Sequence, residues 1–406
     1  MTTKVLFVDD EMNVLSGLRR MLRGQRNVWE MQFANGGAAA LELLAKEPFD
    51  VVVTDMRMPE IDGAELLHRV VSLHPATVRL VLSGQSEHEK IFRAIGPAHQ
   101  FLSKPCEPDV LVQTIQRACG LRQRFQDAAL QGVTAQIGSL PSLPRIYEEL
   151  VHELQAEECS LDRVAQIIGS DVAMTAKVLQ LVNSSFFGLP QHVSCPKHAV
   201  SLLGLNIIQP LVLSADAFFA FEDPEIEGYS LHHSIEHSLA VGIAARAISQ
   251  SECSETQCSD SQCANDALIA GMLHDIGKLI LATHARETFI ESLRLAKESA
   301  VSAWQAEMSV FGTTHAEVGA YLLGLWGLPN PILEAVAFHH RPQAAEEHLF
   351  SPLDAVYAAN ILQHQQPGTP EAAPCADWDV AYLDKQGLSG HIPKWQAIME
   401  RHEVTL

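Results

Sequence analysis

Five short apolar runs alternate with helical patterns near the N-terminus, and this alternation constrains the fold of the first 120 residues. The runs span residues 5–8, 29–33, 51–53, 78–82 and 99–103. Two of them are continuous and rich in β-branched residues, as in strands that are buried on both faces. Apolar residues at helical spacing lie between the runs, for example in 14–22 and 66–70. The pattern predicts an α/β doubly wound, flavodoxin-like domain of five parallel strands with helices on both faces.

Polar residues follow the predicted strands where each strand ends. They are Asp9, Asp10, Asp55, Ser83 and Lys104. In the strand order 2-1-3-4-5, the first and third strands are neighbours, so the three carboxylates converge at the carboxyl edge of the sheet. Clustered carboxylates repel one another unless a cation neutralises them, and oxygen ligands of this kind suit Mg²⁺. Lys104 adds a fixed positive charge, and Ser83 adds a hydroxyl that can meet a phosphoryl oxygen.

This segment resembles the receiver domain of two-component response regulators, which has this fold. The alternative is an unrelated flavodoxin-like domain whose loops are acidic by chance. The resemblance rests on Asp9-Asp10, Thr54–Pro59, Asp62-Gly63, Ser83-Gly84 and Lys104-Pro105, which stand in the family's order and spacing. It implies that Asp55 is the phospho-acceptor and that Asp9, Asp10 and the Arg57 carbonyl help to hold Mg²⁺. It also implies phosphoryl contacts from Ser83 and Lys104, and a cis peptide between Lys104 and Pro105.

The same resemblance places Phe101 at the family's aromatic switch position. Phosphorylated Asp55 would draw Ser83 toward the phosphoryl group, and Phe101 would rotate inward to fill the vacated space. The surface around the fourth and fifth strands would change, and the helix that follows leads into the linker.

A polar helical linker and a second domain follow the receiver-like segment. We expect a receiver domain over 1–120, a linker over 121–138 and a helical domain over 139–365, followed by a helical tail over 366–406 with no evident role. Residues 251–263 are polar and predict a loop. Cys253, Cys258 and Cys263 lie there at five-residue steps, which differ from the close cysteine pairs of zinc sites, so we favour reduced thiols.

Apolar residues recur at helical spacing almost throughout the second domain, which predicts an all-α fold. One helix is expected over 267–283, with His274 and Asp275 in its middle. A buried carboxylate next to an imidazole is costly unless it is paired or binds a metal. Further candidate ligands are His233, His237, His315, His339, His340 and Asp354. Imidazole and carboxylate ligands suit Fe, Mn, Zn or Ni.

The second domain resembles the HD superfamily of metal-dependent phosphohydrolases, because His237, His274, Asp275 and Asp354 match its four-ligand pattern. His315 and the His339-His340 pair resemble the additional ligands of the HD-GYP branch, which hydrolyses cyclic di-GMP. However, Arg341-Pro342-Gln343 stands where that branch has its Gly-Tyr-Pro segment.

The resemblance to the HD-related output domain, HDOD, is closer. It rests on Leu140–Pro144, Ser170-Asp171, Leu181–Ser185 and Ala199–Gly204. HDOD members often lack the full ligand set and are mostly regarded as non-catalytic, whereas this chain keeps the set. The resemblance implies a non-catalytic output that binds a partner protein. The alternative is a phosphorylation-regulated HD-type phosphohydrolase acting on cyclic dinucleotides.

The charge and composition of the chain limit the classes of partner that we expect. Residues 1–125 carry equal numbers of basic and acidic residues, so the rest of the chain holds the whole net charge of −21. Phosphate contacts require basic surfaces, so nucleic acid is excluded as the expected partner. No signal peptide or membrane-spanning stretch is evident, which predicts a cytoplasmic protein. We expect a sensor histidine kinase and a downstream signalling protein, such as a cyclic di-GMP enzyme, as partners, and a homodimer formed through the receiver or the linker.

Overall fold

The computed structural model describes residues 2–84, 97–124, 140–142, 144–156, 159–183, 192–205, 208, 218–220, 226–255, 261–345, 349–366 and 378–402. Residues 125–138 of the expected linker, Cys258 and part of the Leu181–Ser185 motif lie outside these ranges. The expected loop over 251–263 is wrong for all of its described residues, since helices extend to Glu255 and begin again at Ser261. Cys263 is a free thiol, and its sulfur accepts a hydrogen bond from the Ser249 hydroxyl at 3.5 Å.

The N-terminal domain is built on a five-stranded parallel sheet in the order β2-β1-β3-β4-β5, as expected. The strands are β1 Thr3–Asp9, β2 Trp29–Asn35, β3 Val51–Asp55, β4 Val78–Gly84 and β5 Gln100–Lys104. The helical segments described around the sheet are α1 Met12–Met21, η1 Leu22–Gln25, α2 Gly37–Leu44, α3 Gly63–Leu73 and α5 Pro108–Arg124. All five residues of β3 are buried, which explains why its sequence is a continuous apolar run ending in Asp55.

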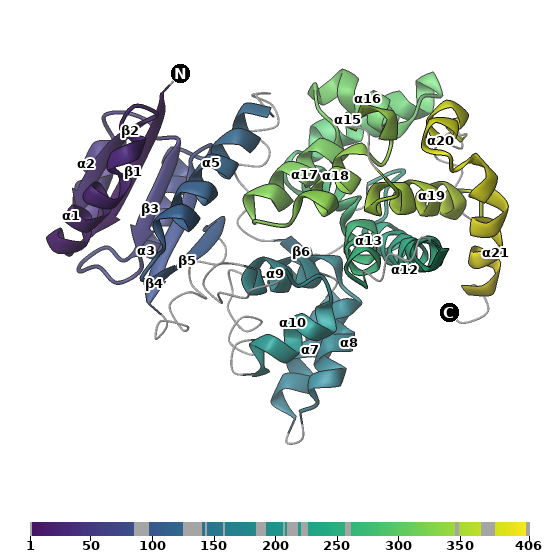
Figure 1. Ribbon diagram of the computed structural model, residues 1–406, viewed down its shortest axis with the longest axis horizontal. Coiled ribbons are helices and arrows are strands. Elements are labelled where there is room, and N and C mark those ends of the chain that lie inside the picture. The colour runs from purple at the N-terminus through teal and green to yellow at the C-terminus, as the bar shows by residue number, and fades with distance from the viewer. Residues whose placement is uncertain are drawn as a thin grey trace.

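The C-terminal part of the chain is mostly helical (Figure 1). Its helices are α7 Pro144–Gln155, α8 Leu161–Gly169, α9 Val172–Val182, α10 Pro196–Leu203, α12 Leu231–Glu255, α13 Ser261–Leu273, α14 Ile276–His284, α15 Arg286–Ser299, α16 Ala303–Phe311, α17 His315–Leu325, α18 Asn330–Phe338, η2 Pro342–Ala344 and α19 Pro352–His364. The all-α expectation missed one element, a pair of short parallel strands, β6 Leu140–Ser142 and β7 Phe218–Ala220. None of the described helices is long and apolar enough to cross a membrane.

Two close helix contacts shape the centre of the helical domain. At the crossing of α12 and α13, a Cβ on Gly271 would lie 2.6 Å from the Cα of Gly242, so only glycine fits there. On α14, a Cβ on Gly277 would overlap the backbone carbonyl of His315 at the start of α17. These contacts bring the N-terminal ends of α14 and α17 together, next to α12.

The C-terminal tail docks on the helical domain through a buried glutamate. The described tail consists of α20 Val380–Gln386, η3 Ser389–His391 and α21 Ile392–His402. Glu252 of α12 accepts a hydrogen bond from the Trp395 indole at 2.8 Å, and it lies 2.9 Å from His391 Nδ1 and 3.2 Å from Lys394 Nζ. Burial opposes ionisation of Glu252, but these donors outweigh it and lower its pKa.

We predict that Trp395→Ala destabilises the helical domain by about 3–5 kcal/mol, the usual cost of removing a buried indole. The indole is fully buried, and its loss also removes a donor from the buried Glu252 carboxylate. Urea unfolding followed by circular dichroism measures the change. Val380→Ala, at an exposed tail position, is the control and should change stability by less than about 0.5 kcal/mol. Equal effects of the two substitutions would contradict a docked tail.

Candidate phosphorylation and metal sites

The expected acidic site lies at the carboxyl edge of the receiver-like sheet. Asp9 ends β1 and Asp55 ends β3, and both carboxylates are buried. Lys104 Nζ from the end of β5 lies 2.7 Å from Asp9 Oδ2 and also contacts Asp55 Oδ1. The Arg57 backbone N–H donates to Asp55 Oδ2 at 2.5 Å. The peptide between Lys104 and Pro105 is cis.

Electrostatics leave Asp55 in need of more positive charge. Burial raises the pKa of Asp55, and the contacts from Lys104 and Arg57 reduce this effect without cancelling it. Asp10, next to Asp9, is exposed to solvent. The site therefore holds two buried carboxylates and one exposed carboxylate against a single lysine, and hard oxygen donors of this kind fit Mg²⁺.

The two switch residues are buried in the unmodified chain. Ser83, near the end of β4, and Phe101, in β5, are both 0% exposed. The inward rotation of Phe101 on phosphorylation stays a prediction, and the ring is already buried in the unmodified chain. Lys104 and Gln100, at the two ends of the same strand, both make side-chain polar contacts.

The second candidate site lies where several helices meet at Asp275. The expected single helix over 267–283 is wrong: α13 ends at Leu273 and α14 begins at Ile276, so His274 and Asp275 form a turn between them. This turn frees both side chains from a regular helical face. His315 is the first residue of α17, and the His339-His340 pair directly follows α18.

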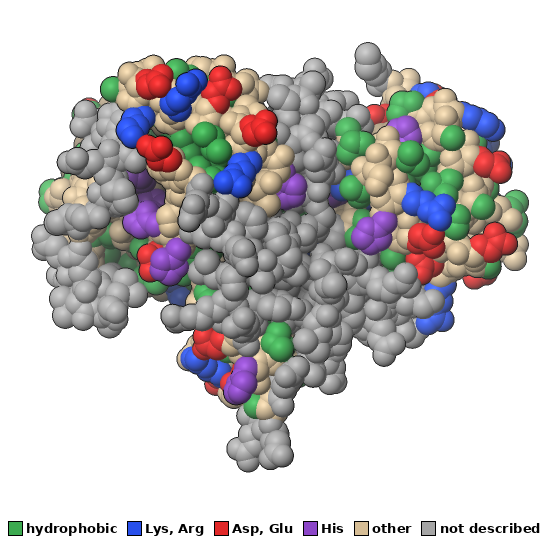
Figure 2. All heavy atoms as spheres, turned by 180° about the vertical axis from the view of Figure 1, so that it is seen from behind, with side chains coloured by type: hydrophobic (Ala, Val, Ile, Leu, Met, Phe, Trp, Pro, Cys, Tyr) green, Lys and Arg blue, Asp and Glu red, His purple; other side chains and the backbone are tan. Residues whose placement is uncertain are grey.

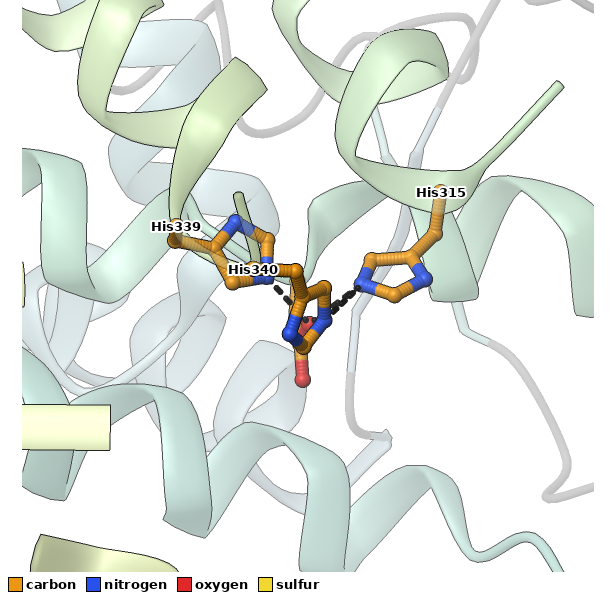
Figure 3. Close-up of side chains that lie close together, drawn as sticks. His315, His339 and His340 are labelled. Carbon is orange, nitrogen blue, oxygen red and sulfur yellow. Dashed lines mark hydrogen bonds and ion pairs between the residues drawn. The ribbon is translucent and has the colours of Figure 1, made fainter. Parts of the chain in front are cut away.

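Four of the predicted ligands surround one carboxylate. His315 Nε2 and His339 Nε2 lie 3.2 Å and 3.8 Å from Asp275 Oδ1, and His274 Nε2 lies 3.5 Å from Asp275 Oδ2. His340 Nε2 lies 3.0 Å from His315 Nε2. Figure 3 shows the rings of His315, His339 and His340 converging.

These ligands form two groups that share Asp275, and in each group the ligand atoms lie within 4.8 Å of one another. One group holds Asp275, His315, His339 and His340, and the other holds His237, His274 and Asp275. We refer to the six residues together as the histidine cluster.

Two imidazoles of the histidine cluster, those of His274 and His339, are held in the tautomer that binds metals through Nε2. His274 Nδ1 lies 2.7 Å from the Gly271 carbonyl and His339 Nδ1 lies 2.8 Å from the Val336 carbonyl, so each Nδ1 carries the proton. Their Nε2 atoms then carry a lone pair that can bind a metal. Among the described residues, both Nε2 atoms and Asp275 Oδ1 are buried without a hydrogen-bond partner. Buried polar atoms of a native protein are nearly always satisfied. A metal ion would satisfy all three.

Burial keeps most of the cluster neutral. It lowers the pKa of His274 to about 4 and that of His237 to about 2, and it holds those of His339 and His340 well below the usual range. For Asp275, burial opposes ionisation, but its interactions with His274, Lys278 and His315 outweigh burial and hold the pKa well below normal. A charged carboxylate among neutral imidazoles is the ligand state that divalent metals require.

Sequence reasoning missed three residues that support the cluster. Glu307 on α16 accepts from His315 Nδ1 at 2.6 Å and from the His315 backbone N–H at 2.8 Å. Lys278 Nζ lies 2.6 Å from Asp275 Oδ2, and Asn360 Oδ1 on α19 lies 3.0 Å from His237 Nε2. Only Lys278 had a local signal, its position three residues after Asp275 on a helix.

The expectation that Asp354 joins the histidine cluster is wrong. Asp354 is the third residue of α19, where it closes a capping box with Ser351. Its second oxygen accepts from the Tyr382 hydroxyl of the tail at 2.6 Å. Both carboxylate oxygens are thus used at a helix N-terminus, where a negative charge is favourable. His233 is exposed on α12 and belongs to neither described ligand group.

The fold and the two sites together define a two-domain signalling protein of the response-regulator class. Residues 5–116 match the response regulator receiver domain, and residues 140–342, half of the chain, match the HDOD domain. The chain belongs to the HDOD domain family and carries a receiver domain at its N-terminal end.

The chain is similar to several other proteins. An uncharacterized protein of Treponema pallidum is 25% identical over 285 residues, which are 69% of this chain and 51% of the relative. The hydrogenase transcriptional regulatory protein HoxA of Bradyrhizobium diazoefficiens is 35% identical over 131 residues, 32% of this chain and 26% of HoxA. The chain thus spans about half of one curated relative and about a quarter of the other. The MmoQ response regulator structure from Methylococcus capsulatus is 25% identical, with a TM-score of 0.47 over 60% of this chain and 97% of MmoQ.

We predict that the metal-free chain loses stability in mild acid. In the unfolded chain, histidines have a pKa of about 6.5. In the folded chain, the pKa of His274 is about 4 and that of His237 is about 2. Their contribution to stability is therefore present above pH 6.5 and is lost as the pH falls toward these folded-state values. His315 acts in the opposite sense: burial lowers its pKa, but Glu307 and Asp275 outweigh burial and raise it.

Urea unfolding at pH 7.5, 6.5 and 5.5 in the presence of a chelator measures this dependence. His274→Ala should flatten the decrease in unfolding free energy, since one proton-binding difference is removed. His198→Ala, at an exposed position of the same domain, should leave the decrease unchanged. A decrease that His274→Ala leaves as steep as in the wild type would show that the His274 imidazole is not buried in neutral form.

Proposed function

We propose that the protein is a phosphorelay response regulator in which Asp55 accepts a phosphoryl group from a sensor histidine kinase. The observation that carries the proposal is the contact of Lys104 with both buried carboxylates, Asp9 and Asp55, at the sheet edge. Mg²⁺, held by Asp9, Asp10, Asp55 and the Arg57 carbonyl, would supply the remaining positive charge. The HDOD domain then relays the signal by binding a partner protein.

The phosphoryl transfer follows from the site's geometry. One carboxylate oxygen of Asp55 forms a bond to phosphorus while the phosphorus–nitrogen bond of the kinase phosphohistidine breaks, and the leaving imidazole keeps the electron pair. Lys104 then pairs with the new phosphoryl oxygens through charge-assisted bonds, with Ser83 as a second donor. Because Lys104 already contacts Asp55, the modification changes a contact made by the last residue of β5.

In the output domain, we propose that the histidine cluster holds a transition metal, Fe, Mn, Zn or Ni, through His237, His274, Asp275, His315, His339 and His340. The three buried atoms without hydrogen-bond partners support this assignment. The side chains of His274, His315 and His339 are 0% exposed. Catalytic metal sites keep an open position, whereas structural sites are closed, so this burial favours a binding module over a hydrolase.

A metal-dependent phosphohydrolase is the second candidate, because two ligand groups share one carboxylate. Two metal ions held by groups that share a carboxylate would be suited to activating a water for attack on a phosphodiester. In that case the substrate would be a cyclic dinucleotide and the metals would activate a water.

The surface favours a protein partner over nucleic acid. Over the described part of the face in Figure 2, Lys and Arg side chains are interspersed with Asp and Glu and form no continuous basic patch. A downstream signalling protein, such as a cyclic di-GMP enzyme, fits this surface. A homodimer through the receiver would use a surface other than the Gln100 and Arg117 side, because that side contacts the chain's own output domain.

Asp55→Asn should abolish labelling by small phosphodonors such as acetyl phosphate, because an amide oxygen is too weak a nucleophile to accept the phosphoryl group. Phosphate-affinity gel electrophoresis with Mg²⁺ present measures the label. Asp50→Asn, at another receiver carboxylate away from the sheet edge, should label like the wild type. Labelling of Asp55→Asn at the wild-type level would place the phosphorylation elsewhere.

Freshly purified protein should contain about one or two transition metals per chain by elemental analysis, as expected for the two overlapping ligand groups. Asp275→Ala should remove the metal and lower the unfolding temperature, since the histidines lose their shared carboxylate. His198→Ala should keep the wild-type metal content and unfolding temperature. Hydrolysis of cyclic di-GMP that depends on metal and Asp275 would favour the second candidate, and metal-free wild-type protein after metal supplementation would contradict both forms of the site.

A further inference from the structure

The receiver domain contacts the connection between α17 and α18. Gln100 Nε2, at the start of β5, donates to the Leu325 carbonyl at 2.8 Å. Arg117 on α5 donates to the Leu328 carbonyl and lies 3.4 Å from the Gly327 carbonyl. In Figure 1, α5 lies on the side of the receiver that faces α17. Two receiver side chains thus bind three backbone carbonyls in the connection between α17 and α18.

The turn held in this way has a glycine conformation and buried neighbours. Gly327 has a φ of +84°, a conformation that favours glycine, and the turn's Trp326 and Leu328 are buried. Lys177 of α9 lies 4.5 Å from the centre of the Trp326 ring, and Gln180 of α9 donates to the His99 carbonyl just before β5 at 3.0 Å. The receiver, α9 and the turn therefore form one packed contact.

The other ends of the two helices carry half of the histidine cluster. His315 begins α17, and His339 and His340 follow α18. With 11 and 9 residues, the helices extend about 16 Å and 13 Å at 1.5 Å per residue. The close contact of Gly277 with the His315 backbone ties α17 to α14, next to Asp275. A displacement of the turn would therefore change the spacing between Asp275 and the imidazoles of His315, His339 and His340.

One strand links this turn to the phosphorylation site. β5 has five residues, with Gln100 at its first position and Lys104 at its last. Lys104 contacts Asp55, and Gln100 contacts the α17–α18 turn. A change in the position of Lys104 therefore acts on the same short strand that binds the output domain.

We propose that Gln100 and Arg117 are positioning residues that couple Asp55 to the histidine cluster through the α17–α18 hairpin, so that phosphorylation changes metal affinity. This inference rests on the proposed function, because it requires both a phosphorylated Asp55 and a metal in the cluster. Coupling between two binding sites is reciprocal, so the metal must change the affinity of the receiver for a phosphoryl mimic by the same factor.

The test uses the full chain, stripped of metal with a chelator that is then removed. Zn²⁺ affinity is measured in competition with a chromophoric chelator, with and without beryllofluoride and Mg²⁺ as the phosphoryl mimic. We expect the mimic to change the Zn²⁺ dissociation constant at least about fivefold, the lower end of typical allosteric coupling. In the Gln100→Ala/Arg117→Ala double variant this ratio should fall to near one, while both ligands still bind.

The matched control is Gln116→Ala/Arg69→Ala, which removes the same residue types at exposed receiver positions and should keep the wild-type ratio. A ratio near one in wild-type protein that binds both Zn²⁺ and beryllofluoride would overturn the coupling and leave the proposed function intact. The full wild-type ratio in the double variant would overturn the route through these two residues.

A reciprocal measurement needs no variant. Saturating Zn²⁺ should change the beryllofluoride affinity of the wild type by the same factor, and an unchanged affinity would overturn the coupling. Failure of beryllofluoride or of Zn²⁺ to bind the wild type at all would instead overturn the proposed function, and the coupling with it.

Discussion

The buried carboxylate of Asp275 is the constraint on which the helical domain depends. A charge in the interior of a protein is strongly destabilising unless partners surround it. Here Lys278 contacts one oxygen, and the Nε2 atoms of His274, His315 and His339 lie within 3.8 Å of the carboxylate. Three places in the fold therefore meet at Asp275: the turn between α13 and α14, the start of α17 and the end of α18. Because His274 and His339 present lone pairs to the carboxylate, Lys278 supplies the nearby positive charge, and a bound cation would add to it.

The receiver domain also contains a buried carboxylate next to a lysine. Asp55 is also buried, and a single lysine, Lys104, contacts it together with Asp9. The two domains therefore each hold a buried carboxylate, and β5 and the α17–α18 hairpin lie between the two sites. Under the proposed coupling, a cation or phosphoryl group at either site would change how strongly the elements between them are held.

The sequence predicted the receiver better than the output site, and the reason is the range of the contacts. The strands and their terminal Asp9, Asp55 and Lys104 follow from local apolar runs and from the geometry of a parallel sheet. The histidines were found because a His-Asp pair in an apolar segment is conspicuous. Asp354 was misassigned because its partner Tyr382 belongs to the tail, which no local pattern connects to α19.

Other features of the cluster were also beyond a sequence pattern. Asn360 and Glu307 reach the histidines from other helices, at sequence separations of 123 and 8 residues, without any periodicity that would link them. The helix break at His274 was missed because the apolar residues on both sides continue at helical spacing. Tertiary contacts override local propensity at such places.

The docking of the tail bears on where this domain can be divided. The HDOD match ends at residue 342, but α19 and the tail complete the same packed unit. Asn360 of α19 reaches His237, and Trp395 of the tail reaches Glu252, both on α12. A fragment cut at the boundary of sequence similarity would leave one long side of α12 uncovered and its buried glutamate facing water. The unit that folds is therefore longer than the unit that is shared with relatives, and the added C-terminal helices are part of its interior.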